Sequence, residues 1–301
     1  MNRKCLILAA IAASVLLCHP ASGLAGPVPV LGSATDFAVL GATTVTNTGS
    51  TTLVGSPSVN ANLGLYSGTS ITGLGPGPDQ VTITNGTVEK TTAAAQQAQV
   101  DLTKAYTALG ALAPTQPTPQ ADLGGLTLLP GVYHFDSSAA ITGLLKLDAQ
   151  NTDGVYWVFQ IPSTLTTAAT NSIVQLINAN ASGNNGADIG VFWLVGSSAT
   201  LGTYTTFEGN ILASESISLL TGATILNGRA LAQTGAVSMD TNAISDICPS
   251  NNNGPGFSGG LMFAGEGSTT LVPIPEPCTI LLLGSGLAGL FAARRRSRSA
   301  V

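Results

Sequence analysis

The body of the chain alternates short apolar and β-branched runs with glycine, asparagine and serine, a pattern typical of short strands separated by turns. This pattern repeats. The tetrapeptides that align with one another are Thr164–Thr167, Thr200–Thr203, Ser218–Thr221 and Ser238–Thr241. Each starts roughly 20 residues or slightly fewer after the one before, except for the first interval, which is about twice as long. One repeat in that first interval therefore has no matching tetrapeptide.

A second register agrees with the first. Val155–Phe159 matches Val191–Val195 two periods later, and Gly209–Ala213 matches Gly228–Ala232 one period later. A unit this short cannot bury its apolar side alone, whereas stacked units build a continuous core. The repeat therefore predicts a mainly β fold, a β-solenoid with coils about 4.8 Å apart. In that stack, the side chains expected in one core column are Leu165, Leu201, Leu219 and Met239. A β-sandwich also needs many short strands, but it predicts no fixed period.

One segment departs from the β pattern. Residues 88–112 are rich in alanine and other helix formers. They carry an apolar stripe at three- and four-residue spacing, formed by Ala94, Ala98, Leu102, Ala105, Leu109 and Leu112. The prolines from Pro114 onward end the pattern, so one amphipathic helix is expected alongside the solenoid. The glycine-, serine- and proline-rich stretch 53–80 is expected to cap an open end of the stack.

The two ends have the composition of targeting segments. Arg3 and Lys4 precede an uncharged apolar run, which predicts a signal peptide at 1–25. Residues 26–248 then form the solenoid domain, and 249–273 a flexible linker. Within 274–301, the residues Pro275, Glu276 and Pro277 precede sixteen uncharged residues and a run of three arginines. This order resembles the PEP-CTERM sorting signal of Gram-negative bacteria, which implies processing by an exosortase and a transmembrane helix that engages the inner membrane transiently. The body is thus expected to be secreted and to reside at the cell surface or in the extracellular matrix.

Charge narrows the choice of partner. Outside the two ends, four basic residues face fourteen acidic ones. This balance argues against nucleic acid as a partner. Charged residues make up 8% of the whole chain, against about 25% in ordinary soluble domains. Of the four cysteines, Cys248 alone lies in the predicted solenoid, so no disulfide framework is expected.

The residues do not predict enzyme chemistry. His134 is the sole histidine of the body, and no cysteine or histidine cluster has metal-ligand spacing. We therefore expect no metal and no cofactor. The alternative of a carbohydrate-active enzyme rests on carboxylates that could pair as in glycosidases, namely Asp148 with Asp153 or Glu208 with Glu215.

Threonines recur at the end of the aligned strands. Three tetrapeptides have threonine at the first and fourth positions and a small residue at the second, namely Thr48–Thr51, Thr167–Thr170 and Thr221–Thr224. Two further tetrapeptides occupy corresponding places in the repeat, namely Thr203–Thr206 and Thr241–Ile244. Stacked coils would align these side chains at regular spacing. Because β-branched threonine has few rotamers and no charge, a flat rank of threonines suits a crystalline partner. Strand propensity alone also favours threonine, but it does not predict the register.

Several segments resemble the microbial ice-binding protein family. They are Phe37–Leu40, Asp101–Tyr106, Leu123–Tyr133, Val195–Thr203 and Asn227–Val237. The resemblance implies a discontinuous right-handed β-solenoid of triangular cross-section with one long α-helix packed alongside. It also implies an ice-binding face, and the positions that match it are Thr48, Thr51, Thr167, Thr170, Thr203, Thr206, Thr221, Thr224 and Thr241. Tyr204, Asn242 and Ile244 depart from the family's repeat.

Two functions follow as hypotheses. The first is a secreted, surface-tethered protein that adsorbs to an ice crystal surface and limits its growth or recrystallisation. The alternative is a structural or adhesive component of the extracellular polysaccharide matrix, because the sorting signal resembles those of bacteria that build exopolysaccharide.

Overall fold

The computed structural model describes residues 28–75, 77, 80–168, 170, 172–179, 186, 188–245, 257–265 and 268–273. The predicted signal peptide, Cys248 and the predicted sorting segment lie outside these residues. Within them, no helix combines the length and the apolar character needed to cross a membrane. The predicted membrane-engaging segment, 278–293, also lies outside the described residues.

Three parallel sheets make up most of the described chain. The helix-covered sheet has the spatial order β10 (Gly131–His134), β13 (Tyr156–Ile161), β16 (Gly190–Val195), β19 (Asn210–Ala213), β22 (Ala230–Ala232), β2 (Phe37–Gly41), β5 (Asn62–Leu65) and β8 (Val88–Lys90). The seven-stranded sheet has the order β11 (Ala139–Ile141), β14 (Leu165–Thr167), β17 (Ala199–Leu201), β20 (Ile217–Leu219), β23 (Val237–Asp240), β3 (Thr44–Thr48) and β6 (Ser70–Ile71). The uncovered eight-stranded sheet has the order β7 (Val81–Thr84), β4 (Thr51–Val54), β24 (Ala243–Ser245), β21 (Thr224–Leu226), β18 (Thr206–Glu208), β15 (Ile173–Ile177), β12 (Leu144–Asp148) and β9 (Thr127–Leu128).

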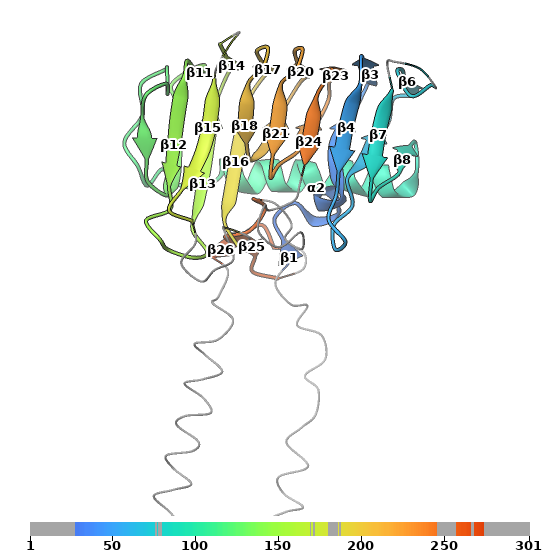
Figure 1. Cartoon of the computed structure of the whole chain (residues 1–301). Coiled ribbons are helices and arrows are strands. Elements are labelled where there is room, and N and C mark those ends of the chain that lie inside the picture. Colours follow the sequence, from blue (N-terminus) through green and yellow to red (C-terminus); the bar gives the residue numbers. More distant parts are fainter. Residues whose placement is uncertain are drawn as a thin grey trace, which may run out of the picture.

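Each coil of the chain gives one strand to each sheet in turn, so the stack has three sides (Figure 1). This arrangement confirms the predicted β-solenoid. The stacking order differs from the chain order, because the last coil (β22, β23 and β24) pairs with the first coil (β2, β3 and β4). In the chain, helix α2 (Ala93–Gly110) follows β8 and precedes β9. The helix runs along the stack (Figure 1).

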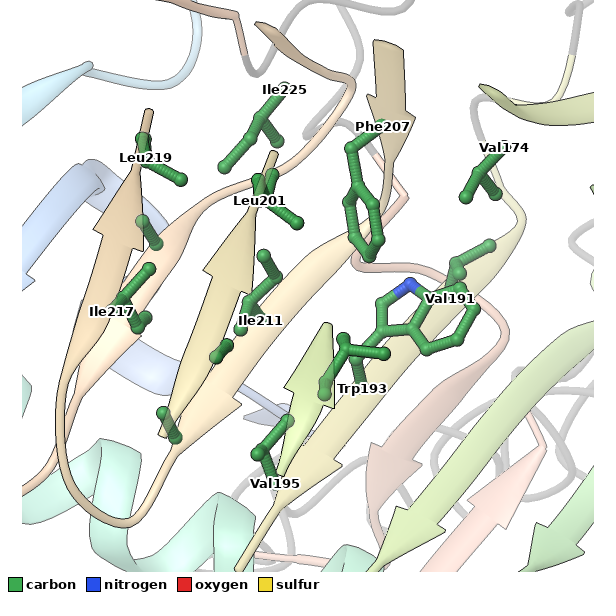
Figure 2. Close-up of a cluster of buried hydrophobic side chains, with 14 of the residues drawn as sticks. Val174, Val191, Trp193, Val195, Leu201, Phe207, Ile211, Ile217, Leu219 and Ile225 are labelled. Atoms are coloured by element: carbon green, nitrogen blue, oxygen red, sulfur yellow. The ribbon is translucent and has the colours of Figure 1, made fainter. Parts of the chain in front are cut away.

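The core lies between the three sheets and is filled by the inward-facing residues at alternate strand positions. Figure 2 shows part of it, with Trp193, Phe207 and Leu219 pointing into the same interior. Rings of successive coils stack in this core. The Phe159 and Trp193 ring centroids are 3.9 Å apart, and Tyr133 lies 5.4 Å from Phe159 on the other side. These contacts, with the surrounding aliphatic side chains, stabilise the stack.

Helix α2 covers the outer side of the helix-covered sheet. Its buried residues are Ala95, Ala98, Leu102, Ala105, Ala108 and Leu109. They pack on side chains such as Val158, Phe192 and Leu212 of the sheet. The predicted start at 88 was wrong, because Val88–Lys90 pairs with β5 as strand β8. The helix begins after Thr92, whose hydroxyl accepts a hydrogen bond from the Ala95 N–H and so caps the first turn.

The predicted linker is partly folded. Strands β1 (Val28–Pro29), β25 (Leu261–Phe263) and β26 (Leu271–Pro273) form a small antiparallel sheet at the base of the solenoid in Figure 1. Phe257, Leu261 and Phe263 are buried. The prediction of a flexible tether to residue 273 was therefore wrong for 257–265 and 268–273, because apolar side chains in this stretch find a surface to pack against.

Arg229 joins Ser258, which lies just before β25 of this small sheet, to the solenoid. Its guanidinium is fully buried and donates to the Thr35 carbonyl at 2.8 Å, to Asn210 Oδ1 at 2.9 Å and to Ser258 Oγ at 2.7 Å. Asn210 in turn donates to the Phe257 carbonyl. Residues far apart in the sequence thus converge on a single buried side chain.

The predicted core column was right in part. Leu201 and Leu219 are paired, and Ser218 pairs with Ser238, which places Met239 beside them. Leu165, however, pairs with Ala199, two residues before Leu201. The alignment of Thr164–Thr167 with the other tetrapeptides was therefore displaced by two residues. Both registers point leucine inward, since side chains alternate with a period of two.

Candidate functional site

The outer side of the seven-stranded sheet carries a column of hydroxyl side chains. Strand pairing places one from each of five successive coils in register, namely Thr166, Thr200, Ser218, Ser238 and Thr46. The residues beside them in sequence face the core, for example Leu165 and Ile217, which are fully buried. Ser238 Oγ donates to Ser218 Oγ at 3.2 Å, so the column is linked from one coil to the next. Five coils at the spacing of paired strands extend about 19 Å.

A second column lies two residues earlier in each strand and therefore on the same side. Its members are Thr164, Ser198, Ser216, Ala236 and Thr44. All five are partly exposed. Together the two columns are here named the hydroxyl face. No residue of the hydroxyl face is charged, and none is larger than threonine. The face is therefore small in relief and neutral.

The turns that join the seven-stranded sheet to the uncovered eight-stranded sheet form a second threonine-rich region, here named the threonine corner. It comprises Thr203–Thr206, Thr221–Thr224, Asp240–Ala243 and Thr48–Thr52. Each turn contains one residue with a positive φ, and these residues are Tyr204, Gly222, Thr241 and Gly49. The N–H groups of Tyr204, Gly222 and Thr241 each donate to a carbonyl in the turn of the next coil, as in Tyr204 to the Thr221 carbonyl at 3.0 Å. The four turns are thus stacked in register.

The structure divides the predicted ice contacts between two sides. Thr48 ends β3, and Thr203 and Thr221 lie two residues after the ends of β17 and β20; each stands just before the residue with positive φ. Thr206 and Thr224 pair with each other at the start of β18 and β21, on the uncovered eight-stranded sheet. Thr241 is exposed and itself has a φ of 55°. Thr170 is exposed in the turn between β14 and β15. The predicted set therefore does not form one plane.

Two predicted contacts point inward and cannot touch a crystal. Thr51 has no exposed surface, and its hydroxyl accepts a hydrogen bond from the Asn242 N–H at 3.0 Å. Thr167 is 8% exposed, and its hydroxyl accepts from the Gly202 N–H at 2.7 Å and bonds to the Thr205 hydroxyl at 2.6 Å. For these two residues the prediction was wrong. Both hydroxyls satisfy backbone groups inside the turns, which would otherwise be buried without partners.

The prediction also missed residues. Thr52 is the exposed threonine on β4, where it continues the outer side of the uncovered eight-stranded sheet and pairs with Ala243. The hydroxyl column was missed as a surface, although Thr200, Ser218 and Ser238 headed three of the aligned tetrapeptides. The sequence pattern that could have revealed this column is the alternation of side chains along a strand. A hydroxyl residue next to an inward-facing leucine or methionine must face outward.

Two residues interrupt the threonine corner. Asp240 places a carboxylate there, which accepts hydrogen bonds from the hydroxyls of Thr221 and Thr241. Tyr204 is 67% exposed and brings an aromatic ring to the same region. The hydroxyl face has no aromatic ring and no charged member, and the carboxylate beside it, Glu215, accepts a hydrogen bond from Ser198 at its border, so it is the more uniform surface of the two.

Three of the four carboxylates considered as catalytic pairs accept hydrogen bonds within the fold. Glu208 lies on β18 of the uncovered eight-stranded sheet, and its Oε2 accepts from the Leu176 N–H at 2.6 Å. Burial raises the pKa of the Glu208 carboxyl to about 7. Glu215 lies in the turn before β20 and accepts from the Ser197 hydroxyl, so it lies at a different edge of the solenoid. A hydrogen bond from the Asn178 side chain lowers the pKa of Asp148.

No group of three or more metal-ligating side chains occurs among the described residues. His134 is exposed on β10, with Nδ1 3.3 Å from Gln160 Oε1.

Comparison with known proteins agrees with this fold. Residues 39–245 match the family model described as ice-binding-like. The chain belongs to this family. Residues 273–296 match the PEP-CTERM protein-sorting motif, so both predicted resemblances are confirmed.

Individual relatives cover the whole sequence or the whole domain. The chain is 44% identical over 300 residues to an ice-binding protein of Nostoc sp. (strain HG1), which covers 99% of this chain and 98% of the relative. A crystal structure of an ice-binding protein from the Antarctic ascomycete Antarctomyces psychrotrophicus is similar with a TM-score of 0.62 at 38% identity, over 72% of this chain and 98% of that chain. An ice-binding protein from an Antarctic biological consortium is similar with a TM-score of 0.62 at 39% identity, over 73% and 92% of the two chains.

Proposed function

We propose that this protein is exported, sorted through its PEP-CTERM motif and binds ice through the hydroxyl face. The observation that carries the proposal is the register of Thr166, Thr200, Ser218, Ser238 and Thr46 on the outer side of one sheet. The membership of the ice-binding-like family and the match to an ice-binding protein over 99% of the chain support it.

The hydroxyl face suits a crystal for physical reasons. Its side chains are short, so few rotamers are lost when they meet an ordered lattice. Its backbone is held by parallel pairing on both sides of each inner strand, so the surface does not need to reorganise on contact. A neutral surface also holds its hydration water less firmly than a charged one, and that water must give way to ice. Binding then limits growth or recrystallisation by covering the crystal.

The uncovered eight-stranded sheet is less suited to this role. Its outer side includes the partly exposed charged residues Lys146, Asp148 and Glu208. It also carries exposed Leu144, Ile173 and Leu226. These side chains differ in length and charge from coil to coil, so they do not form a level plane.

The test compares two tyrosine substitutions in the same coil, measured as thermal hysteresis and recrystallisation inhibition of the full-length protein. Ser218→Tyr places a ring in the middle of the hydroxyl face, and we expect it to remove most of the activity. Leu226→Tyr places the same ring on the outer side of the uncovered eight-stranded sheet, and we expect it to leave the activity unchanged. Equal activity of the wild type and Ser218→Tyr would reject the hydroxyl face as the site.

The sorting motif supports export and an exosortase as processing partner. We further propose that the processed protein stays at the surface of a Gram-negative cell or in its polysaccharide matrix, with the C-terminal segment in the inner membrane only before processing. A wild-type protein without ice activity that binds the host's extracellular polysaccharide would favour the matrix function instead.

A further inference from the structure

Tyr204 has a backbone conformation that bulky residues seldom adopt. Its φ is 55°, whereas the stacked positions in the next coil and in the coil of β3 are Gly222 and Gly49. Glycine takes a positive φ without steric cost, but a tyrosine there strains the backbone. Tyr204 is also 67% exposed, so burial of the ring does not compensate for the strain. A strained, exposed aromatic residue is a reason to look for a role outside folding.

The ring lies directly over the neighbouring turn. A Cβ atom added to Gly222 would lie 2.6 Å from both Cδ1 and Cε1 of Tyr204. The Thr241 side chain lies over Gly49 in the same way as the Tyr204 ring lies over Gly222. A Cβ atom added to Gly49 would lie 2.2 Å from Thr241 Oγ1. Each glycine thus accommodates the side chain of the preceding coil. The short side chain of Thr241 protrudes little from the threonine corner. The larger ring of Tyr204 protrudes above its own coil and the next one.

The coil next to Tyr204 shows how this turn is built without a ring. Thr221–Thr224 has glycine at the position of positive φ, and its buried residue is Ala223. Thr203–Thr206 has the equally buried Thr205, and Thr206 pairs with Thr224. The two turns therefore have the same architecture. On the surface they differ at one position, where Tyr204 stands in place of Gly222.

We infer, on the basis of the ice-binding function proposed above, that Tyr204 determines which part of the surface meets ice. Its ring stands over the threonine corner and holds a crystal plane away from Thr203, Thr221 and Thr224. Contact is then confined to the hydroxyl face. Without the ring, these partly exposed threonines of the corner would extend the contact around the edge of the solenoid.

The test is Tyr204→Gly in the full-length protein, with Tyr204→Asn as a second small residue that tolerates a positive φ. Tyr204→Phe is the matched control, because it keeps the ring and removes only the hydroxyl. Thermal hysteresis is measured at equal molar concentration, and the crystal planes bound are mapped by fluorescence on a single ice crystal. We expect both small residues to raise the hysteresis and to add at least one plane, and Tyr204→Phe to match the wild type. Thermal unfolding reports whether each variant is folded.

Each contrary result has a distinct meaning. An active wild type whose hysteresis and planes are unchanged or reduced in folded Tyr204→Gly and Tyr204→Asn would overturn the role of Tyr204 and leave the hydroxyl face intact. A rise in Tyr204→Phe as well would also overturn it, because the ring would still cover the corner. A wild type with no ice activity would reject the ice-binding function, and the role of Tyr204 with it.

Discussion

The hydroxyl of Thr221 donates a hydrogen bond to the carboxylate of Asp240 in the following coil. Thr241 donates to the other oxygen of the same carboxylate at 3.0 Å. Asp240 therefore accepts hydrogen bonds from the hydroxyls of two threonines of the corner and fixes the orientation of these hydroxyls. It also brings a charge to the edge of an otherwise neutral surface.

We predict that Asp240→Asn strengthens ice adsorption. The amide oxygen can still accept one threonine hydroxyl, so the turn should keep its shape and lose about 1 kcal/mol of stability. Asp240 lies two residues after Ser238 on β23 and so borders the hydroxyl face, and the substitution removes its strongly hydrated charge. Thermal hysteresis should rise in Asp240→Asn and stay at the wild-type level in the control Asp148→Asn, whose carboxylate lies on the uncovered eight-stranded sheet. A fall in activity would show that the carboxylate takes part in the contact.

The second prediction concerns pH and Glu208. Burial raises the pKa of its carboxyl from the ordinary 4.5 to about 7, although the hydrogen bond from Leu176 N–H acts in the opposite direction. Between these two values the folded protein holds a proton that the unfolded chain has released. The free energy of unfolding should therefore increase as the pH falls from about 8 to about 5, by an amount of order 1–3 kcal/mol.

Urea unfolding at several pH values measures this effect. Glu208→Gln keeps an acceptor for the Leu176 N–H and has no titratable proton, so it should be more stable than the wild type at pH above about 7 and nearly independent of pH. A wild type that loses stability over the same fall in pH would contradict the assignment.

The third prediction concerns Arg229, which donates to Thr35, Asn210 and Ser258 from a fully buried position. Arg229→Met removes these hydrogen bonds and leaves buried acceptors without partners, at a cost of about 2–5 kcal/mol. The thermal midpoint should fall, and residues 257–273 should become accessible to protease before the solenoid does. Ser258→Ala removes a single partner and should cost about 1 kcal/mol. Equal protection of the segment in Arg229→Met and wild type would show that its apolar contacts suffice.

The fourth prediction concerns the stacked rings of the core. Trp193 is fully buried between Phe159 and Phe207, with ring centroids 3.9 Å and 5.1 Å away. Trp193→Ala should cost about 3–5 kcal/mol through lost contacts and a cavity. Trp193→Phe should cost less. Denaturant midpoints measure both, and the ice activity of the folded fraction should not change, because the site lies on the outer side of another sheet.

The fold could be predicted because a repeat this short requires stacking to bury its apolar side. Thr200, Ser218 and Ser238 were aligned correctly, and the structure pairs them in register. The misplacement of Leu165 has a simple cause. A slip of two residues keeps every side chain on its own face, so the inside-outside pattern cannot detect it.

The site was harder to predict because turns differ in length. Ser50 adds one residue to the turn after Thr48, which moves Thr51 to the interior and Thr52 to the surface. A one-residue change exchanges the two faces of a strand, so a tetrapeptide motif alone does not give orientation. Only the pairing between coils shows which threonines are exposed.

The stretch 257–273 illustrates a different limit. Leu261, Met262 and Phe263 were visible in the sequence as an apolar run, but the surface that receives them is assembled by the first strand and the helix. Lys104 of α2 places its Nζ 4.5 Å from the centre of the Phe263 ring. No local pattern identifies such a partner, because the contact joins residues from distant parts of the sequence.

The pairing of β22 with β2 has a consequence for the biogenesis of the protein. Val39 and Ala230 are neighbours in one ladder although most of the domain separates them along the chain. The first two coils therefore lack one of their lateral supports until the final coil has been synthesised and released. Assembly cannot proceed in simple vectorial order, and such non-local closure makes folding slow. A long-lived unfolded chain is the form in which a polypeptide can be threaded through a translocation channel.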